Sequence, residues 1–542
     1  MTLFNETLNG KESKIPVSRN GQSNILSTSS KAESIQGWLI DKLAEVLEIE
    51  PNQIDVGQDF EEYGLESAEA INLSGDLEDY LGCRLPPTLL WDYQNIEALA
   101  SYLANGNLSQ IKTNPSSLDL SAGTVVNSSQ SNFDDPSQVE IPLENYKFAE
   151  FPEYKKLLAQ QEQVNSLGNG NPFFIPQETV VNDRTTINGR ELINFATYNY
   201  IGMCGDPQVS QAANEATDRY GTSACASRLI SGEKPLHREL ERELADFIGV
   251  EDCIVMVGGH ATNVTTIGHL FGKGDLVIYD TLSHNSILQG CFLSGASLIS
   301  FPHNDIDALE KILRDRRHRY QRVLIVIEGV YSTDGDVADL PPIIALKQKY
   351  KTLLMVDEAH SIGAIGKTGR GISEYYDIDP NEIDLWMGTL SKSFASCGGY
   401  IAGSAALVEY LKYTAPGFVF SVGMSPPNAA ATLAAVRVLK AEPERATTLQ
   451  ARAKLFLDLA KEHGLDTGMS QDSPVIPIIV GDSLKSIQLS QNLFKRGINV
   501  PFMIYPSVPQ NGARLRFFIT CNHTEEQIRL TIKTLAEELN KL

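Results

Sequence analysis

Residues 385–394 read LWMGTLSKSF, an apolar run followed at once by the hydroxyl of Thr389 and by Lys392. Two earlier apolar runs end in the same manner, one in Asp280-Thr281-Leu282-Ser283-His284 and one in Asp357-Glu358-Ala359-His360. Short apolar runs of this kind predict buried strands of a mostly parallel sheet, in which ligands bind beyond the carboxyl ends of the strands. The polar groups that follow these runs should therefore converge at one edge of the sheet.

The wider pattern around these runs predicts an α/β fold. Apolar runs alternate with helical patterns through most of the chain, as in a sheet flanked by helices. The final stretch, with a helix from Thr524, predicts a smaller α+β unit. The predicted strands are Cys253–Val257, Asp275–Tyr279, Ser297–Phe301, Val323–Ile327, Thr352–Val356, Leu385–Gly388, Val475–Val480 and Leu515–Ile519.

The groups at the strand ends are those that pyridoxal phosphate requires. This cofactor needs a lysine for its Schiff base, a carboxylate to keep the pyridine nitrogen protonated, and hydroxyl or amide donors for its phosphate. Lys392 and Asp357 suit the first two roles. His360 could bond the phenolic oxygen of the cofactor, and His284 could stack on its ring. Each residue alone also has a structural explanation, such as a buried ion pair for Lys392, and it is their order that indicates the cofactor.

A candidate phosphate turn lies upstream, where residues 256–263 read MVGGHATN. Gly259 and His260 begin a predicted helix there, and backbone N–H groups at a helix N-terminus can hold a phosphate. Gly-Gly pairs are often simple turns, so this signal is weak alone. His303 and His237 have no comparable placement, and we interpret them as structural.

Ser67 lies in a second informative stretch, where residues 61–68 read EEYGLESA. Apolar residues at helical spacing follow from Ile71 to Leu81, so Ser67 should stand at the start of a helix, where its ordinary role is an N-cap. Helical periodicity also covers Ser34–Leu47 and Ile96–Leu103. These segments predict a small all-α bundle of the size of a carrier domain.

Composition limits the classes of protein to be considered. The 542 residues include 42% hydrophobic ones, enough for several domains, and the net charge is -23. This charge argues against nonspecific binding to nucleic acid or to anionic membranes. The 7 cysteines show no metal-ligand spacing, so we expect no metal site and a reducing, cytoplasmic location. No membrane span or export signal is expected.

The domain organisation follows from shifts in composition. We predict a disordered tail over 1–32, a carrier domain over 33–104, a flexible Ser/Asn-rich linker over 105–146 and a catalytic region over 147–542. The catalytic region should divide into a large domain over about 195–435 and a small C-terminal domain over about 436–542. A polar helix near Tyr154–Gln163 should introduce it.

From about Phe148 onward, the chain resembles the α-oxoamine synthases, a group that includes serine palmitoyltransferase and 8-amino-7-oxononanoate synthase. This resemblance implies the pyridoxal-phosphate fold type I, with a large mostly parallel-sheet domain and a small α+β domain. The motifs stand in family order. They are Asn194-Phe195, Tyr198–Gly202, Tyr220–Thr222, Ser227–Gly232, His237–Glu241, Asp280–His284, Glu328–Ser332, Val356–His360 and Thr389–Lys392.

The resemblance implies a role for each matching position. Lys392 matches the Schiff-base lysine and proton shuttle, and Asp357 matches the partner of the ring nitrogen. Arg516 matches the arginine that binds the amino-acid carboxylate, for which a forked guanidinium is well suited. The remaining assignments are ring stacking and substrate contact for His284, the phenolic oxygen for His360, cofactor or phosphate contacts for Ser332, Thr389, Gly259 and His260, and substrate contacts for Ser507 and Tyr198.

Two departures from the family pattern stand out. His260 occupies a position where an aromatic or apolar residue is usual. Residues 420–427 resemble a loop contributed across a dimer, but Val422 and Gly423 replace hydroxyl residues common there.

The N-terminal bundle resembles an acyl carrier protein of polyketide and fatty-acyl-ligase systems. Residues 85–93, LPPTLLWDY, and 96–100, IEALA, carry this likeness, although Gly64-Leu65-Glu66-Ser67 departs from the commoner Asp-Ser-Leu. The resemblance implies a 4'-phosphopantetheine group on Ser67. It also implies two partners, a phosphopantetheinyl transferase and an acyl-loading enzyme such as a fatty acyl-AMP ligase or a polyketide synthase.

These features predict a homodimeric pyridoxal-phosphate acyltransferase that condenses a small amino acid with an acyl thioester carried on Ser67, releasing carbon dioxide and an α-aminoketone. Tyr198-Asn199-Tyr200 resembles the serine palmitoyltransferase branch, which favours serine over alanine or glycine. Three alternatives remain: an enzyme that uses acyl-CoA and keeps the bundle for docking, an aminotransferase, and a non-catalytic binding subunit. Lys392 argues against the last.

Overall fold

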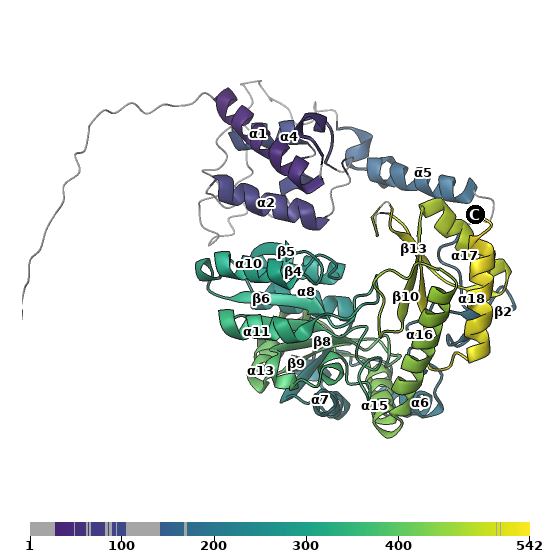
Figure 1. Ribbon diagram of the computed structural model, residues 1–542. Coiled ribbons are helices and arrows are strands. Elements are labelled where there is room, and N and C mark those ends of the chain that lie inside the picture. The colour runs from purple at the N-terminus through teal and green to yellow at the C-terminus, as the bar shows by residue number, and fades with distance from the viewer. Residues whose placement is uncertain are drawn as a thin grey trace, which may run out of the picture. The chain divides into compact units, whose positions relative to one another are not determined.

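The computed structural model describes residues 28–47, 49–60, 63, 67–81, 85, 89–93, 95–104, 141–166, 171–505, 507–509 and 511–542 (Figure 1). These residues form two compact units, described separately below. Most of the predicted tail (1–32) and of the predicted linker (105–146) lies outside them. No described helix is both long enough and apolar enough to span a membrane.

The N-terminal unit is helical, as its periodicity predicts. Helix α1 (Thr28–Leu47) packs on α4 (Ile96–Ala104) through side chains such as Leu43 and Leu99, both fully buried. Helix α2 begins at Ser67 and ends at Leu81, and the short α3 covers Leu89–Asp92. Trp38 on α1 stacks on Tyr80 on α2, with their ring centroids 5.0 Å apart. The predicted helix start at Ser67 is therefore confirmed.

A seven-stranded sheet in the order β3-β9-β8-β7-β6-β4-β5 organises the larger unit. Five neighbouring strands run parallel, while β9 runs antiparallel to both β3 and β8. Each predicted strand of this sheet is present, within one residue at either end. The strands are β3 (Asp252–Met256), β4 (Leu276–Asp280), β5 (Ser297–Phe301), β6 (Val323–Glu328), β7 (Leu353–Asp357), β8 (Leu385–Thr389) and β9 (Gly399–Gly403).

Both faces of this sheet are buried, which explains why its strands are continuously apolar. Along β6, Ile325 and Ile327 belong to one core cluster and Leu324 and Val326 to a second, because successive side chains of a strand point to opposite faces. Helices α8, α9, α13 and α14 contribute to the second cluster, and α6, α7, α10, α11 and α15 to the first. The larger unit therefore has an α/β fold, in which helices cover both faces of the sheet, as predicted.

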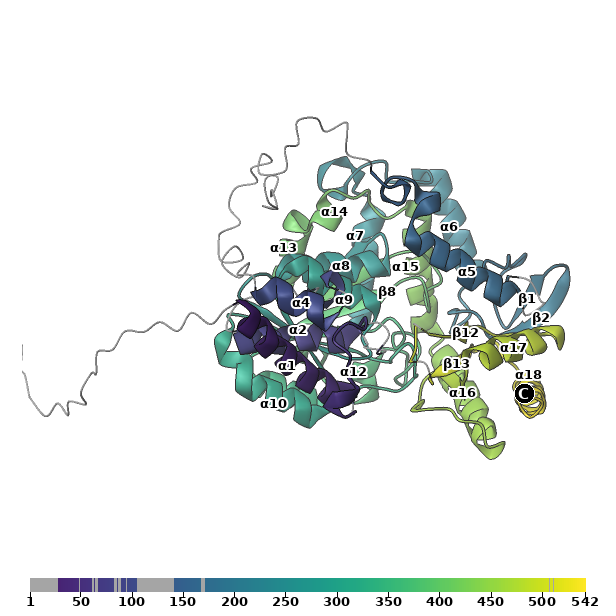
Figure 2. The ribbon, with the colours of Figure 1, turned by 90° about the horizontal axis from the view of Figure 1, so that it is seen from above.

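The C-terminal part carries a second, smaller sheet in the order β10-β13-β12, covered by α16 to α18. Figure 2 shows α17 beside β12 and β13. Thr524 is the N-cap of α18, where its hydroxyl accepts a hydrogen bond from the Gln527 amide at 3.2 Å. The strands are β10 (Val475–Gly481), β12 (Phe502–Met503) and β13 (Ala513–Phe518); β1 (Arg184–Ile187), β2 (Arg190–Asn194) and β11 (Ile498–Asn499) form a third sheet.

The helices of the larger unit begin with α5, whose place was predicted from its polar periodicity. In chain order they are α5 (Pro152–Ser166), α6 (Pro207–Tyr220), α7 (Pro235–Ile248), α8 (Gly259–Leu270), α9 (Asn285–Ser294), α10 (Ile306–Arg316), α11 (Leu340–Tyr350), α12 (Ile372–Tyr375), α13 (Ala405–Thr414), α14 (Pro416–Val419), α15 (Pro426–Ala441), α16 (Glu444–Glu462), α17 (Ser483–Lys495) and α18 (Glu525–Leu539). A one-turn π-helix covers Arg228–Gly232.

Candidate active site

Asp357 is the last residue of β7 and is buried, with 3% of its surface exposed. Its Oδ2 accepts a hydrogen bond from the side-chain amide of Asn263 on α8 at 2.8 Å, and its Oδ1 accepts one from the Ala359 amide at 2.9 Å. Hydrogen bonds of this kind satisfy the oxygens of a buried carboxyl group and fix its orientation. Asp357 is thus a fixed buried acceptor at the carboxyl end of the central strand.

Lys392 follows the neighbouring strand β8 and is half-buried, with its Nζ 5.5 Å from the centre of the Tyr198 ring. Burial lowers the pKa of Lys392 to about 8, although the charges of Asp357 and Glu328 oppose this shift. A lysine with such a pKa is partly unprotonated near neutral pH. Its nitrogen can therefore act as a nucleophile or accept a proton.

His284 lies at the N-cap of α9, just beyond β4, and two contacts fix its loop. Its backbone amide donates to the buried Glu328 Oε1 at 2.5 Å, and its Nδ1 accepts from the Ser286 amide at 3.2 Å. The neutral ring therefore carries its hydrogen on Nε2. Burial lowers the pKa of His284, and the nearby Lys392 charge adds to this effect while Asp357 opposes it.

His360 is buried behind the same edge, and its Nδ1 lies 2.7 Å from the Tyr200 hydroxyl. Burial holds the pKa of His360 well below its usual value, with further lowering by the Lys392 charge, and burial raises the pKa of Tyr200. When the hydrogen of the neutral ring is on Nε2, Nδ1 accepts this bond from the Tyr200 O–H. Nε2–H of His360 then remains available as a donor.

Arg516 comes from β13 of the smaller sheet. Its guanidinium donates to the Ser332 carbonyl at 2.8 Å and to the Tyr198 hydroxyl at 3.4 Å, and it lies 4.6 Å from the centre of the Phe518 ring. A guanidinium has five N–H donors, so donors remain for a ligand carboxylate. The structure thus connects Arg516, Tyr198 and Ser332, three predicted site residues from separate parts of the chain.

The predicted phosphate turn opens α8 at Gly259, directly against the end of β8. A Cβ on Gly259 would lie 2.7 Å from the Thr389 hydroxyl, so only glycine permits this approach of the helix N-terminus. The hydroxyl of Thr389 donates to the Gly398 carbonyl at 3.2 Å. The exposed His260 ring lies edge-on to His284, with centroids 6.4 Å apart.

These groups fit pyridoxal phosphate on structural grounds. The lysine of lowered pKa, the buried carboxyl group, the buried His360 and the glycine at the start of α8 all lie at or just after strand ends of one sheet. Each supplies one of the contacts that the cofactor needs. Among the described residues, no cluster of His, Cys, Asp or Glu could hold a metal ion.

Two predicted site residues have no described contact with this group. Ser507 is exposed in the loop after β12, where its amide donates to the Ile504 carbonyl at 2.9 Å, and no contact within the described part of the chain joins it to the others. Ser67 is the first residue of α2. Both assignments stay predictions.

Sequence reasoning assigned no role to Asn263, Ser286 and Glu328, which hold Asp357 and His284 in place. Asn263 Nδ2 bonds Asp357 at 2.8 Å and Ser286 Oγ at 2.9 Å, so it joins the two loops. Burial raises the pKa of Glu328 well above its usual value, with repulsion from Asp357 adding to it. Glu328 ends a strand, and Asn263 and Ser286 lie in the first turns of the helices that follow strands. Polar residues at such positions could have been predicted as part of the site.

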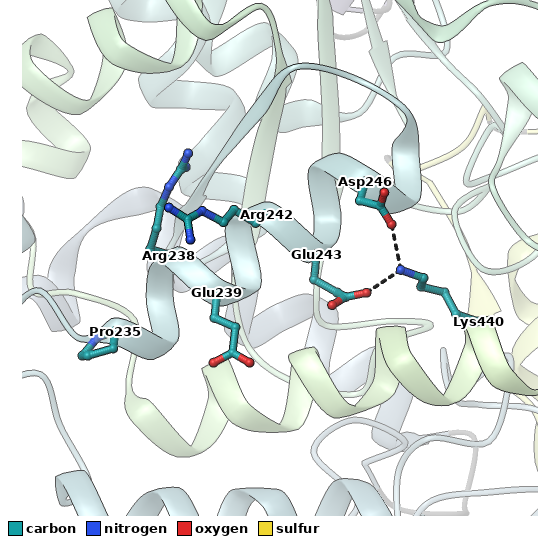
Figure 3. Close-up of a pocket in the computed structure, with 7 residues that line it drawn as sticks. All are labelled: Pro235, Arg238, Glu239, Arg242, Glu243, Asp246 and Lys440. Atoms are coloured by element: carbon teal, nitrogen blue, oxygen red, sulfur yellow. Dashed lines mark hydrogen bonds and ion pairs between the residues drawn. The ribbon is translucent and has the colours of Figure 1, made fainter.

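A separate surface pocket of about 490 Å³ does not resemble a ligand site (Figure 3). It lies along α7 and is lined mainly by charged side chains that already pair. Lys440 donates to Glu243 at 2.5 Å and to Asp246 at 2.8 Å across it. Exposed, internally compensated ion pairs of this kind are typical of a solvated surface.

Glu358, which follows Asp357, should make the free energy of unfolding depend on pH. It is 2% exposed, its Oε1 accepts from the Ile372 amide at 3.0 Å, and burial raises its pKa to about 7. Because the folded state binds the proton more tightly than the unfolded state, this residue lowers the stability as pH rises from about 4.5 to about 7. Glu358→Gln should therefore be more stable than the parent at pH 8, by up to about 3 kcal/mol, and similar at pH 5.

Thermal unfolding of both proteins at pH 5 and pH 8 measures this difference, and effects of all other titrating groups cancel between the two. A gap in Tm that is the same at both pH values would contradict the assignment.

Comparison with known proteins agrees with the geometry. Residues 190–535 match the family model for aminotransferase class I and II, and residues 37–103 match the model for a phosphopantetheine attachment site. The 8-amino-7-oxononanoate synthase of Symbiobacterium thermophilum is 40% identical over 65% of this chain and 90% of that protein. The structure of Sphingomonas wittichii serine palmitoyltransferase is 30% identical, covers 72% of this chain and 98% of its own, and superposes with a TM-score of 0.69. A high-resolution structure of SPT with PLP is 31% identical, over 72% of this chain and 98% of that one, with a TM-score of 0.68.

Proposed function

The chain belongs to the aminotransferase class I and II family, and from this premise we propose that it condenses serine with an acyl thioester carried on its own Ser67 arm. It is a pyridoxal-phosphate acyltransferase of the α-oxoamine synthase group with an N-terminal carrier domain. The reaction is a decarboxylative condensation of an amino acid with an acyl thioester. Serine, the Ser67 arm and the product α-aminoketone are the proposed details.

One observation supports the proposal most strongly. The same chain contains a match to a phosphopantetheine attachment domain and a catalytic site with Lys392, whose pKa is lowered, and the buried Asp357. A synthase without a carrier domain would bind an acyl donor that diffuses freely in solution. A fused phosphopantetheine arm supplies the thioester at high effective concentration instead.

The residues divide the chemistry among them. Bound pyridoxal phosphate supplies the electron-withdrawing ring that makes the α-carbon of the amino acid acidic. Asp357, held by Asn263, would pair with the ring nitrogen of the bound cofactor. Lys392, with its pKa near 8, accepts the α-proton. The Nε2–H of His360 donates to the phenolic oxygen, and Arg516 holds the substrate carboxylate.

The acyl group should reach this site on phosphopantetheine at Ser67. We propose a carrier domain over 33–104, a linker over 105–146 and a catalytic region over 147–542, divided near residue 436. The attachment-site match implies a phosphopantetheinyl transferase as a partner. The acyl-loading enzyme would be a fatty acyl-AMP ligase or a polyketide synthase. The six described cysteines are all unpaired, which supports a cytoplasmic protein.

A homodimer is proposed from an exposed apolar ridge, formed by Ile230 with 80% of its surface exposed, Phe420 with 86% and Val422 with 48%. Two hydrogen bonds join the segments that carry it: the Gly423 amide donates to the Ala226 carbonyl at 3.0 Å, and the Ser227 hydroxyl donates to the Val419 carbonyl at 2.6 Å. Contiguous exposed apolar side chains on a soluble enzyme are typical of a protein interface.

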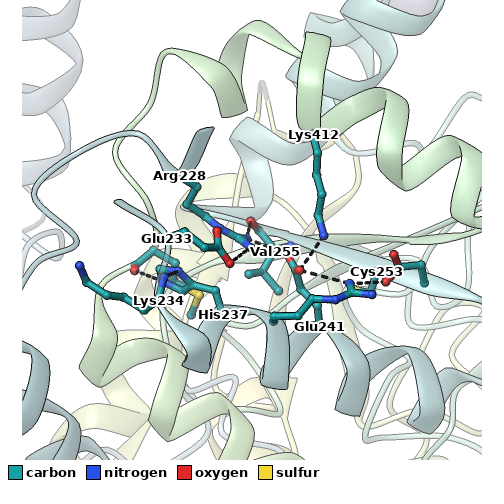
Figure 4. Close-up of polar contacts among 11 residues, drawn as sticks. Arg228, Glu233, Lys234, His237, Glu241, Cys253, Val255 and Lys412 are labelled. Carbon is teal, nitrogen blue, oxygen red and sulfur yellow. Dashed lines mark hydrogen bonds and ion pairs between the residues drawn. The ribbon is translucent and has the colours of Figure 1, made fainter. Parts of the chain in front are cut away.

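A buried ion-pair network anchors this ridge (Figure 4). Arg228, at the start of the π-helix, donates to Glu233 and to the fully buried Glu241, both at 2.6 Å, and Lys412 donates to Glu241 at 2.8 Å. Desolvation opposes the charge on Arg228, but these carboxylates raise its pKa overall. The network therefore keeps Leu229 and Ile230 in a rigid, outward position.

Two measurements test the proposal against its alternatives. Mass spectrometry after treatment with a phosphopantetheinyl transferase should find the modification on the peptide containing Ser67. Incubation of the acylated holo-protein with carboxyl-labelled serine, alanine or glycine should release labelled carbon dioxide, fastest with serine. Transfer of the amino group without carbon dioxide release would favour an aminotransferase, and full activity with acyl-CoA alone would favour the docking-only alternative.

Arg516→Lys tests the carboxylate contact. A lysine keeps the charge but loses the fork and the stacking on Phe518, so the KM for the amino acid should rise by about tenfold or more while the KM for the acyl donor changes little. Arg496→Lys is the matched control, because Arg496, which follows α17, forms ion pairs with Glu537 and Glu538 on α18. Equal rises in both KM values would reject the assignment.

A further inference from the structure

His303, which the sequence left as a structural residue, lies between two carboxylates. Its Nδ1 is 2.9 Å from Asp280 Oδ1, and its Nε2 is 2.8 Å from Asp336 Oδ2. Its side chain is 12% exposed, and its ring lies edge-on to Tyr331 with centroids 4.5 Å apart. The residue stands just after β5, the edge strand of the sheet, which lies beside β4; β6 is the next strand after β4.

The two contacts determine the charge of the ring. A neutral imidazole has one N–H and one lone pair, and a lone pair facing a carboxylate would be repelled. Because both ring nitrogens face carboxylate oxygens, both must carry hydrogen. The two aspartates accordingly raise the pKa of His303 to about 10, against the effect of burial. His303 is therefore a permanent cation at neutral pH.

On one side, this cation fixes the loop that carries His284. Asp280 Oδ1 also accepts from the Leu282 amide at 2.9 Å, and its Oδ2 accepts from the Asn304 amide at 3.0 Å. Asp280 thereby shapes the turn between β4 and α9, at whose end His284 stands. Its own position depends on the positive charge beside it.

On the other side, the cation fixes the turn that contacts Arg516. Asp336 closes this turn, because the Tyr331 amide donates to the Asp336 carbonyl at 3.0 Å and the Gly335 amide donates to the Tyr331 carbonyl at 2.9 Å. Ser332 lies within the turn, and its carbonyl accepts from Arg516 at 2.8 Å. Movement of Asp336 would therefore displace the partner of the arginine.

We infer that His303 is a positioning residue, an imidazolium bridge that joins the His284 loop to the Ser332 turn and so sets the distance between the cofactor and the amino-acid carboxylate. The inference rests on the proposed role of Arg516. It deepens the proposed function, because it names a determinant of amino-acid binding that touches neither substrate nor cofactor.

His303→Gln tests the bridge. The glutamine side chain has one nitrogen in place of the two ring nitrogens that face Asp280 and Asp336, and it carries no positive charge. The absorbance change of the pyridoxal-phosphate-loaded protein on titration with serine, alanine or glycine measures amino-acid binding directly. The half-saturating concentration and the KM for the amino acid should both rise about tenfold, with the KM for the acyl donor unchanged. Asp336→Asn, which removes one of the two charges and keeps the shape, should give a smaller rise in the same direction.

The double variant His303→Gln with Asp336→Asn should recover part of the loss, since it no longer buries two uncompensated charges. Leu313→Ala is the stability-matched control: Leu313 is fully buried near the end of the helix that follows His303, and its truncation should lower Tm without changing amino-acid binding. Unchanged amino-acid binding in both His303→Gln and Asp336→Asn would overturn the bridge, whatever their Tm. A parent protein that binds none of the three amino acids would instead reject the proposed function.

Discussion

Lys392→Ala should abolish turnover and remove the visible absorbance band of the purified protein. The lysine supplies both the covalent link to pyridoxal phosphate and, through its pKa of about 8, the base that takes the α-proton. Proton transfer by a positioned side chain alone contributes about 10²- to 10⁴-fold, so the loss should be at least a thousandfold. Absorbance spectra of the cofactor-loaded protein and carbon dioxide release measure the two effects.

The matched control is Lys454→Ala, because Lys454 is an exposed lysine paired with Asp458 on the surface of α16. Its spectrum and turnover should equal those of the parent. Retention of the band in Lys392→Ala would place the cofactor on another lysine and contradict the site.

Ser67→Ala should abolish product formation from carrier-loaded acyl groups while leaving amino-acid binding intact. Without the hydroxyl, phosphopantetheine has no attachment point, yet the catalytic region is unchanged. The spectral response to serine should therefore match that of the parent, and the rate of aminoketone formation should fall to background. Ser101→Ala, an exposed serine on α4, is the control and should retain full activity.

A free acylated carrier domain added to Ser67→Ala should restore part of the activity. A carrier fused in the same chain as the enzyme acts at an effective concentration of up to about the millimolar range. The free carrier should therefore need a much higher concentration than the fused one. Full activity of Ser67→Ala under carrier-loading conditions would contradict the carrier mechanism.

The central sheet and most of the site could be predicted because both faces of the sheet are buried. Burial makes each parallel strand a continuous apolar run, and the first polar residue after the run marks the site edge, as at Asp357 and Thr389. The cofactor followed from the chemistry of those residues. Substrate assignments such as Arg516 rested on resemblance, because β13 reaches the site from a different sheet.

Strand β9 was missed because its sequence, GYIAG, begins and ends in glycine, which weakens a strand. Close packing explains the glycine at position 399, because a Cβ there would lie 2.5 Å from the Thr262 hydroxyl. The contacts of His303 could not be predicted, for a different reason. Its two carboxylate partners come from other strand ends, Asp280 and Asp336, and no local pattern in the sequence indicates such a bridge.

The most direct test of the account is a single-turnover experiment on the acylated holo-protein, followed by intact mass spectrometry. Addition of serine should convert the acylated form to the free-thiol form, with one carbon dioxide and one aminoketone released for each acyl group lost. An acyl group that stays on the carrier in the presence of serine, alanine and glycine, while added acyl-CoA is consumed, would contradict it.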